Sequence, residues 1–201
     1  FIATLRVRSA ASPMMNLLAR RNRLRAAIQA LLYGAMTNDP LNKLLLAADI
    51  PWTYVVLIRA YERYARQLGL PYNRQTYENA LLAHPNTVRS MTELFRAKFD
   101  PDFEGLSPTH VDAARGTAIQ NTTGHITDLL GGVTDLTTDQ ILRVFFNMIQ
   151  ATLRTNFYQR DPLQAYHLAL KFNPAKIPTM PEPLPYREIL VHHPKVVGLH
   201  L

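Results

Sequence analysis

The chain has 201 residues, of which 47% are apolar and none is cysteine. It carries a formal net charge of +7 at pH 7, and 17 of its 22 basic residues are arginine. This composition allows a large buried core, excludes disulfides and cysteine-ligated metal sites within the segment, and lacks the run of roughly 18 apolar residues that predicts a transmembrane helix.

The basic residues are unevenly distributed. Six arginines crowd the N-terminus: Arg6, Arg8, Arg20, Arg21, Arg23 and Arg25. Clustered arginine can neutralise phosphates, which would suit a nucleic-acid partner. A solvated helix face, or charges that meet acidic groups elsewhere in the chain, is the other interpretation. No recognition motif accompanies the cluster, so we do not expect nucleic acid as a partner.

Most of the chain has the apolar periodicity of helices. Helix start signals predict helices that begin at Ser12-Pro13, Asp39-Pro40, Pro51, Asn73, Ser107-Pro108 and the capping box Thr137 to Gln140. His84-Pro85 should stop the helix that begins at Asn73, and a further helix should carry Val88, Met91 and Leu94. Gly34 and Gly69 are typical helix terminators. The first helix should bury a stripe that includes Leu24, Leu31 and Leu32, and the last should continue to Tyr158.

The remaining residues follow a different pattern. Apolar and polar residues alternate within 165–172, 187–193 and 196–201, which predicts strands of one small sheet. Prolines are frequent in 174–185, which favours an extended connector. We place His192 and His200 on a half-exposed sheet face. The sequence therefore predicts a mainly α protein, in which a multi-helix domain precedes a small β segment that begins an α/β domain.

We divide the chain accordingly into an N-terminal cut end (1–11), a helical domain (12–158) and a β segment with a Pro-rich connector (159–201). Both ends look like cuts in a longer polypeptide, because the chain starts at Phe1 and finishes on a strand pattern. No secretory leader is evident.

The residues offer little catalytic chemistry. No G-x-G-x-x-G or Walker motif occurs, the adjacent His192 and His193 should point to opposite faces of a strand, and no serine lies in a nucleophile elbow. We therefore predict no catalytic, cofactor-binding or metal-binding residue here. Three polar residues at the predicted end of the last helix, Arg154, Asn156 and Gln159, are candidates for hydrogen bonds across a domain junction; an ordinary helix C-terminus is the alternative.

Several stretches are similar to a known family. "ILRVFFNMIQATLRTNFYQ", "ALKFNPAKIP" and "PYREILVHHPKVVGLHL" resemble, in order and spacing, the segment just upstream of the catalytic core in large NAD-specific glutamate dehydrogenases. "NDPLNKLLLAADIPWTYVVLIRAYERYARQLGLPY" and "LLAHPNTVRSMTELFRAKFDP" resemble the helical stretch of the same family. The resemblance covers roughly residues 35–201.

The resemblance implies that the parent enzyme converts L-glutamate, NAD and water to 2-oxoglutarate, ammonia and NADH, as a step in amino-acid catabolism. It implies that 159–201 begins the substrate-binding and oligomerisation domain, and that the catalytic domain of the same polypeptide is the segment's main partner. NAD would bind the parent enzyme and not this segment, which we expect to be an inactive scaffold or coupling region. A cytoplasmic homo-oligomer without membrane contact follows. The competing hypothesis is an independent basic helical module that binds nucleic acid or an acidic protein.

Overall fold

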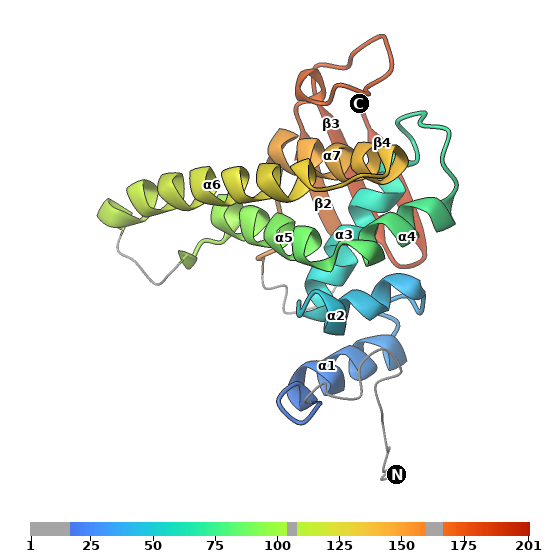
Figure 1. Ribbon diagram of the computed structural model, residues 1–201, viewed down its shortest axis with the longest axis vertical. Coiled ribbons are helices and arrows are strands. Elements are labelled where there is room, and N and C mark those ends of the chain that lie inside the picture. Colours follow the sequence, from blue (N-terminus) through green and yellow to red (C-terminus); the bar gives the residue numbers. More distant parts are fainter. Residues whose placement is uncertain (1–16, 104–107, 160–166) are drawn as a thin grey trace.

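The computed structural model describes residues 17–103, 108–159 and 167–201 and shows helices packed against one antiparallel sheet (Figure 1). The helical elements are α1 (Arg21–Leu32), η1 (Pro40–Lys43), α2 (Leu44–Ala47), α3 (Trp52–Ala65), α4 (Arg74–Ala83), α5 (Pro85–Phe99), α6 (Pro108–Gly131), α7 (Leu136–Ala151) and η3 (Pro174–Lys176). The strands are β1 (Thr152–Thr155), β2 (Leu168–Phe172), β3 (Glu188–His193) and β4 (Val196–His200). The mainly α fold class with a small terminal sheet is confirmed.

Local signals place most helix ends correctly. Gly34 and Gly69 have φ of 72° and 78°, which a glycine adopts without strain, and they follow α1 and α3. The Asn73 side chain accepts the Thr76 N–H at 2.9 Å and caps α4. The expected cap at Ser12 lies outside the described residues.

Two predictions about helices are wrong. Leu32 is 79% exposed, because α1 packs through the small residues Ala27 and Ala30 and leaves its last turn in solvent. The capping box at Thr137 is not used: α7 begins earlier, at Leu136, and Asp135 caps it by accepting the Thr138 N–H at 2.8 Å.

The predicted extension of the last helix to Tyr158 is also wrong. Helix α7 ends at Ala151, and the chain continues directly into β1. The Thr152 hydroxyl donates to the Met148 carbonyl at 2.8 Å, and Lys98 donates to the carbonyls of Ile149, Gln150 and Thr152 at 2.7, 2.8 and 3.0 Å. These tertiary bonds satisfy the final helical carbonyls and end the helix where the local pattern would have continued it.

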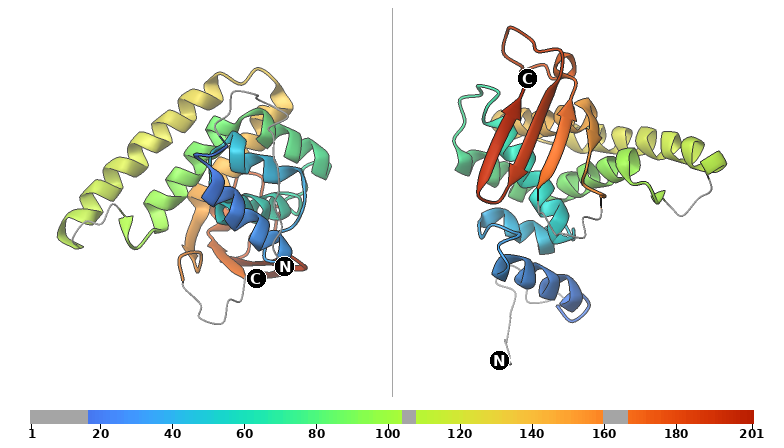
Figure 2. Two further views of the ribbon diagram at one scale, coloured as in Figure 1. Left: turned by 90° about the horizontal axis from the view of Figure 1, so that it is seen from below. Right: turned by 180° about the vertical axis from the view of Figure 1, so that it is seen from behind.

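The sheet has four strands in the order β1-β2-β3-β4, and every neighbouring pair is antiparallel. Three of the strands were predicted, and β1 was not. Helices lie on one face of the sheet, and the opposite face is turned toward the viewer on the right of Figure 2. We call these the inner and outer faces. Apolar side chains at alternate positions bury the inner face: Leu168, Leu170, Phe172 and Leu190.

The Pro-rich connector forms the short helix η3 and then turns, with no strand between residues 177 and 186. Within the described residues, no helix combines the length and the apolar character that a membrane span requires.

Candidate functional site

Helix α3 is the centre of the fold, because it lies between the other helices and the inner face of the sheet (Figure 2). Its apolar side chains are buried at Leu57, Ile58, Tyr61 and Tyr64. Two charged residues of the same helix, Arg59 and Glu62, are each only 2% exposed. A helix that is buried on nearly all sides must find partners for its polar groups within the protein.

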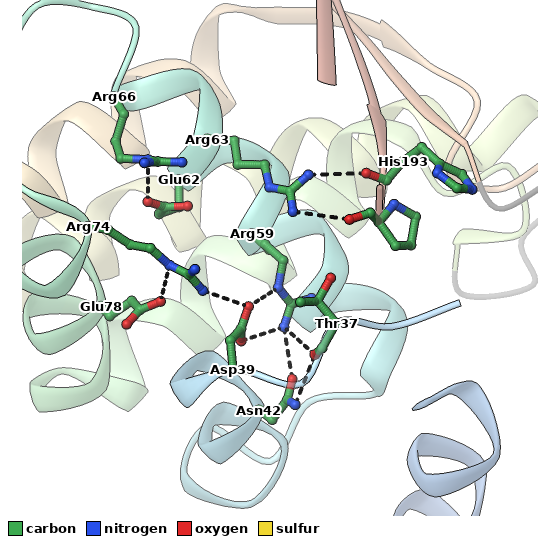
Figure 3. A network of polar contacts seen from close by, with 11 residues as sticks. Thr37, Asp39, Asn42, Arg59, Glu62, Arg63, Arg66, Arg74, Glu78 and His193 are labelled. Carbon is green, nitrogen blue, oxygen red and sulfur yellow. Dashed lines mark hydrogen bonds and ion pairs between the residues drawn. The ribbon is translucent and has the colours of Figure 1, made fainter. Parts of the chain in front are cut away.

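Arg59 finds its partner in the loop before η1 (Figure 3). Its Nε and Nη2 atoms donate to the two carboxylate oxygens of Asp39 at 2.6 and 2.8 Å, and Nη2 also reaches Asn42 Oδ1 at 2.8 Å. Both side chains of the ion pair are almost fully buried. The bidentate geometry matches the planar guanidinium to the carboxylate through Nε and Nη2, while Nη1 is buried without a hydrogen-bond partner among the described residues, and the pair fixes the position of α3 against η1.

The ion pair extends toward α4. Arg74 contacts Asp39 Oδ2 at 3.2 Å and Glu78 Oε1 at 2.7 Å. Glu62 on α3 is paired with Arg66 at 2.8 Å. Burial raises the pKa of Glu62, and the positive charges of Arg66 and Arg74 oppose that rise. The network thus balances its charges across three helical elements (Figure 3).

The same helix holds the sheet. Arg63 donates from Nη1 to the His193 carbonyl at 3.1 Å and from Nη2 to the Pro194 carbonyl at 3.3 Å, at the turn between β3 and β4 (Figure 3). The Tyr64 hydroxyl donates to buried Glu188 on β3, and the Tyr61 and Thr152 hydroxyls are 2.7 Å apart. Helix α3 therefore makes polar contacts with β1, with β3 and with the hairpin turn.

Aromatic packing reinforces these contacts. The Tyr64 ring stacks on Phe172 of β2 with centroids 4.4 Å apart and planes at 5°. Tyr61 meets the same ring edge-on at 6.1 Å. Burial raises the pKa values of both tyrosines, so their hydroxyls stay protonated and serve as hydrogen-bond donors.

His192 lies on the inner face and is 1% exposed, so our placement of it on a half-exposed face is wrong. Burial, together with the nearby charges of Arg63 and Arg59, lowers its pKa to about 3. The ring is therefore neutral near pH 7 and adds no third positive charge beside the two arginines.

The three junction candidates occupy different surroundings. Arg154 is exposed on the outer face of β1, opposite Lys171 of β2, and makes no side-chain hydrogen bond within the described part of the chain. Asn156 extends the pairing of β1 with β2: its Oδ1 accepts the Ala169 N–H at 2.7 Å, and its Nδ2 donates to the His167 carbonyl at 3.1 Å. Gln159 is exposed and donates its backbone N–H to the Asn156 carbonyl.

A cleft of about 350 Å³ lies at the other end of α3, between the loop before that helix and α5. Three of its four charged side chains are engaged within the chain, and the fourth, Glu93, is exposed. Asp49 pairs with Arg20 and Arg23, Arg96 pairs with Asp100, and Arg89 Nε donates to the Ala48 carbonyl. Partial burial opposes ionisation of Asp49, but the two arginines lower its pKa overall. Two N-terminal arginines thus meet an acidic group of the same chain.

Sequence reasoning missed Asp39, Arg59, Arg63 and His192. A signal was present in "LIRAYERYARQL", where charges interrupt an otherwise apolar helix, but nothing local identifies their partners. No group of three or more histidine, aspartate or glutamate side chains gathers into a metal-binding arrangement in the described residues. The ion-pair network around Asp39 and Arg59 therefore holds α3, α4 and η1 together, and its carboxylates are buried.

Comparison with known proteins finds family matches both for the helices and for the sheet. Residues 36–101 match the family model "Glutamate dehydrogenase, helical motif 3", and residues 125–201 match "Bacterial NAD-glutamate dehydrogenase, catalytic domain". The chain belongs to the NAD-specific glutamate dehydrogenase family. The match to the catalytic-domain model begins within α6, so helix α7 and the whole sheet fall inside it.

Curated members of the NAD-specific glutamate dehydrogenase family agree over most of the chain. The protein of that name from Mycobacterium tuberculosis is 39% identical over 186 residues, covering 91% of this chain. Those from Halomonas elongata and Pseudomonas aeruginosa are 35% and 37% identical and cover 93% and 89%. The chain spans about 11% of the length of each of these relatives.

Proposed function

We propose that the chain is part of an enzyme that converts L-glutamate, NAD and water to 2-oxoglutarate, ammonia and NADH. The NAD-specific glutamate dehydrogenases among the relatives and the match to the catalytic-domain model support this assignment. Within that enzyme we assign residues 17–201 a non-catalytic role: the segment supports the first sheet of the catalytic domain. A cytoplasmic homo-oligomer is the form in which we expect the parent enzyme to act.

One observation carries the scaffold role: α3, which lies in the helical-motif match, fills the inner face of the sheet, which lies in the catalytic-domain match. Its contacts with Thr152, Glu188 and the carbonyls of His193 and Pro194 join the two matched regions. The two regions therefore share one core. A movement of the helices would be transmitted to the strands, which is what a coupling region requires.

The described residues do not fit NAD. Dinucleotide binding uses a glycine-rich turn from a strand into a helix, where backbone N–H groups meet the pyrophosphate. Here the strands that follow one another are antiparallel, and the turn between β3 and β4 contains Pro194 and Lys195. We therefore derive no step of the reaction through residues of this segment.

The N-terminal arginines do not favour the alternative of a nucleic-acid-binding module. Arg20 and Arg23 both form ion pairs with Asp49, so these two of the clustered arginines are engaged within the chain.

Two measurements test the proposal. Calorimetric titration of the 201-residue chain with NAD should give no heat of binding, and micromolar affinity would contradict the scaffold role. The full-length parent enzyme should reduce NAD in the presence of L-glutamate, followed by NADH absorbance. Full-length protein that binds glutamate but never forms NADH would refute the proposed activity.

A further inference from the structure

The outer face of the sheet has an apolar centre without a cover in the described residues. The register places Ala169 of β2, Val191 of β3 and Gly198 of β4 in one row across it. Val196 is 63% exposed and Val191 is 41% exposed, and Ile189 of the next row lies beside them. Small and β-branched residues in such rows make a flat apolar platform on which a helix can pack.

The rim of this face is basic. Arg154, Lys171 and His200 lie on it in the row that contains Ile189. The four strands contain one acidic residue, Glu188, which is buried on the inner face against Tyr64. The outer face therefore has positive rim charges with no acidic group among its strand residues.

This charge pattern selects the occupant. A second copy packed symmetrically would set the same basic rim against itself, and like charges across an interface are repulsive. A segment with apolar residues flanked by Asp and Glu would bury the centre and pair with the rim. In the curated relatives, about nine-tenths of the polypeptide lies outside the region that this chain matches.

We propose that the outer face of the sheet is the docking surface for an acidic amphipathic helix carried by another part of the parent polypeptide. The inference rests on the proposed function to the extent that it assumes a larger glutamate dehydrogenase chain. The docked helix would cover Val191 and Val196 and pair with Arg154 and Lys171. The sheet would then have helices on both faces, as sheets of α/β domains do.

Photo-crosslinking in the full-length parent enzyme tests this. A benzoylphenylalanine replaces Val191 in one variant and Leu136, which is 80% exposed at the start of α7, in a control variant. Enzyme made from a mixture of heavy and light isotopes separates links within one chain from links between chains. We expect position 191 to link, within its own chain, to a segment whose apolar residues repeat every three or four positions beside Asp or Glu.

Other outcomes overturn the proposal. A link from position 191 to the same sheet of a second copy would show self-association. A link to an extended strand would show sheet extension. A yield no higher than at position 136 would show a free surface.

Charge variants test the rim. Lys171→Glu should lower the yield of the link at least about fivefold, Lys171→Gln should lower it less, and Lys171→Arg should preserve it. Equal yields in all three would refute the ionic part of the proposal. NADH formation by each variant is measured separately. In the enzyme that carries the photo-crosslinker at position 191 and no charge change, normal turnover without a link refutes docking alone; a link in that enzyme, when the unsubstituted parent enzyme forms no NADH, refutes the proposed activity alone.

Discussion

Arg63 on α3 donates to the carbonyl oxygen of His193, 130 residues later in the chain, at 3.1 Å. Arg63 forms a second bond to the Pro194 carbonyl, so its guanidinium holds the turn between β3 and β4 in place. Both acceptors are backbone atoms, so these two hydrogen bonds depend on the backbone conformation of the hairpin and not on the side chains there. This contact is one of several that join the helical-motif match to the catalytic-domain match.

Replacing Arg63 by methionine should loosen that hairpin. The methionine keeps much of the apolar stem but leaves two carbonyls without their charged donor, at a cost of about 1.5–3 kcal/mol in the free energy of unfolding. Hydrogen exchange of the β4 amides should accelerate. Arg143→Met is the matched control, because Arg143 makes only an exposed pair with Asp139. Equal acceleration of exchange in both variants would contradict the prediction that Arg63 stabilises the hairpin.

The buried pair of Asp39 and Arg59 should be sensitive to the loss of one partner. Asp39→Ala leaves the guanidinium of Arg59 buried without its carboxylate, and we expect a loss of about 3–5 kcal/mol in urea titrations. The double variant Asp39→Leu with Arg59→Met removes both charges, so its cost should be well below the sum of the single changes. Additive costs would show that the two side chains act independently.

His192 should make the protein acid-sensitive. Its pKa is lowered to about 3 in the folded chain, against 6.5 in its unperturbed state. Between these values the unfolded chain binds more protons, so stability falls as the pH drops from about 6.5 toward 3, by on the order of 3–5 kcal/mol. In His192→Phe this part of the pH dependence should disappear. The free energy of unfolding of both proteins is measured between about pH 4 and pH 7. If it changes with pH equally in both, His192 is not the source of the acid sensitivity.

Lys98 predicts a second pH dependence, on the alkaline side. Burial lowers its pKa to about 8, and the charge of Lys176 contributes. Between about pH 8 and the unperturbed 10.5, the unfolded chain binds more protons, so the Lys98 contribution to stability rises with pH. Lys98→Met should remove this slope and also destabilise the end of α7, because three carbonyls lose their donor. A variant that keeps the wild-type slope would identify another titrating group.

Asn156 and Arg154 should differ sharply within the 201-residue chain. Asn156→Ala removes two hydrogen bonds to β2 and its neighbouring residue, and should cost about 1–3 kcal/mol. Arg154→Ala removes an exposed side chain and should change stability by less than about 0.5 kcal/mol. Denaturant titrations of the two variants side by side measure the difference. A larger loss for Arg154 would mean that the side chain has an intramolecular partner.

The fold was predictable where local chemistry determines it. Gly69 closes α3 and Asn73 caps α4 because these residues act on their own backbone. The alternation in β2 and β3 was visible in the sequence because successive residues of a strand point to opposite faces of the sheet. The end of α7 was not predictable, because Leu153 continues the apolar stripe, whereas the residues that bond to the end of the helix, Tyr61 and Lys98, lie far away in the sequence.

The site was less predictable than the fold. Asn156 was named as a junction candidate from its position, and its side chain bonds to residues 167 and 169 of the same sheet. Arg59 and Arg63 were not named, since their partners lie in a loop before η1 and in a hairpin far along the chain. The placement of His192 failed for the same reason. Alternation separates His192 from His193, but which face of the strand is buried depends on α3 packing against the sheet.

The separation between Tyr64 and Glu188 has a consequence for biosynthesis. The two residues are 124 positions apart. At the usual rates of translation, of about 5–20 residues per second, α3 waits roughly 6–25 s after its own synthesis before β3 is made. During that interval Tyr61, Tyr64 and their apolar neighbours have no sheet to cover them. Newly made chains should therefore need protection by chaperones at this stage, and ribosome-bound chains that stop before residue 188 should capture such factors more strongly than chains extending well past residue 201.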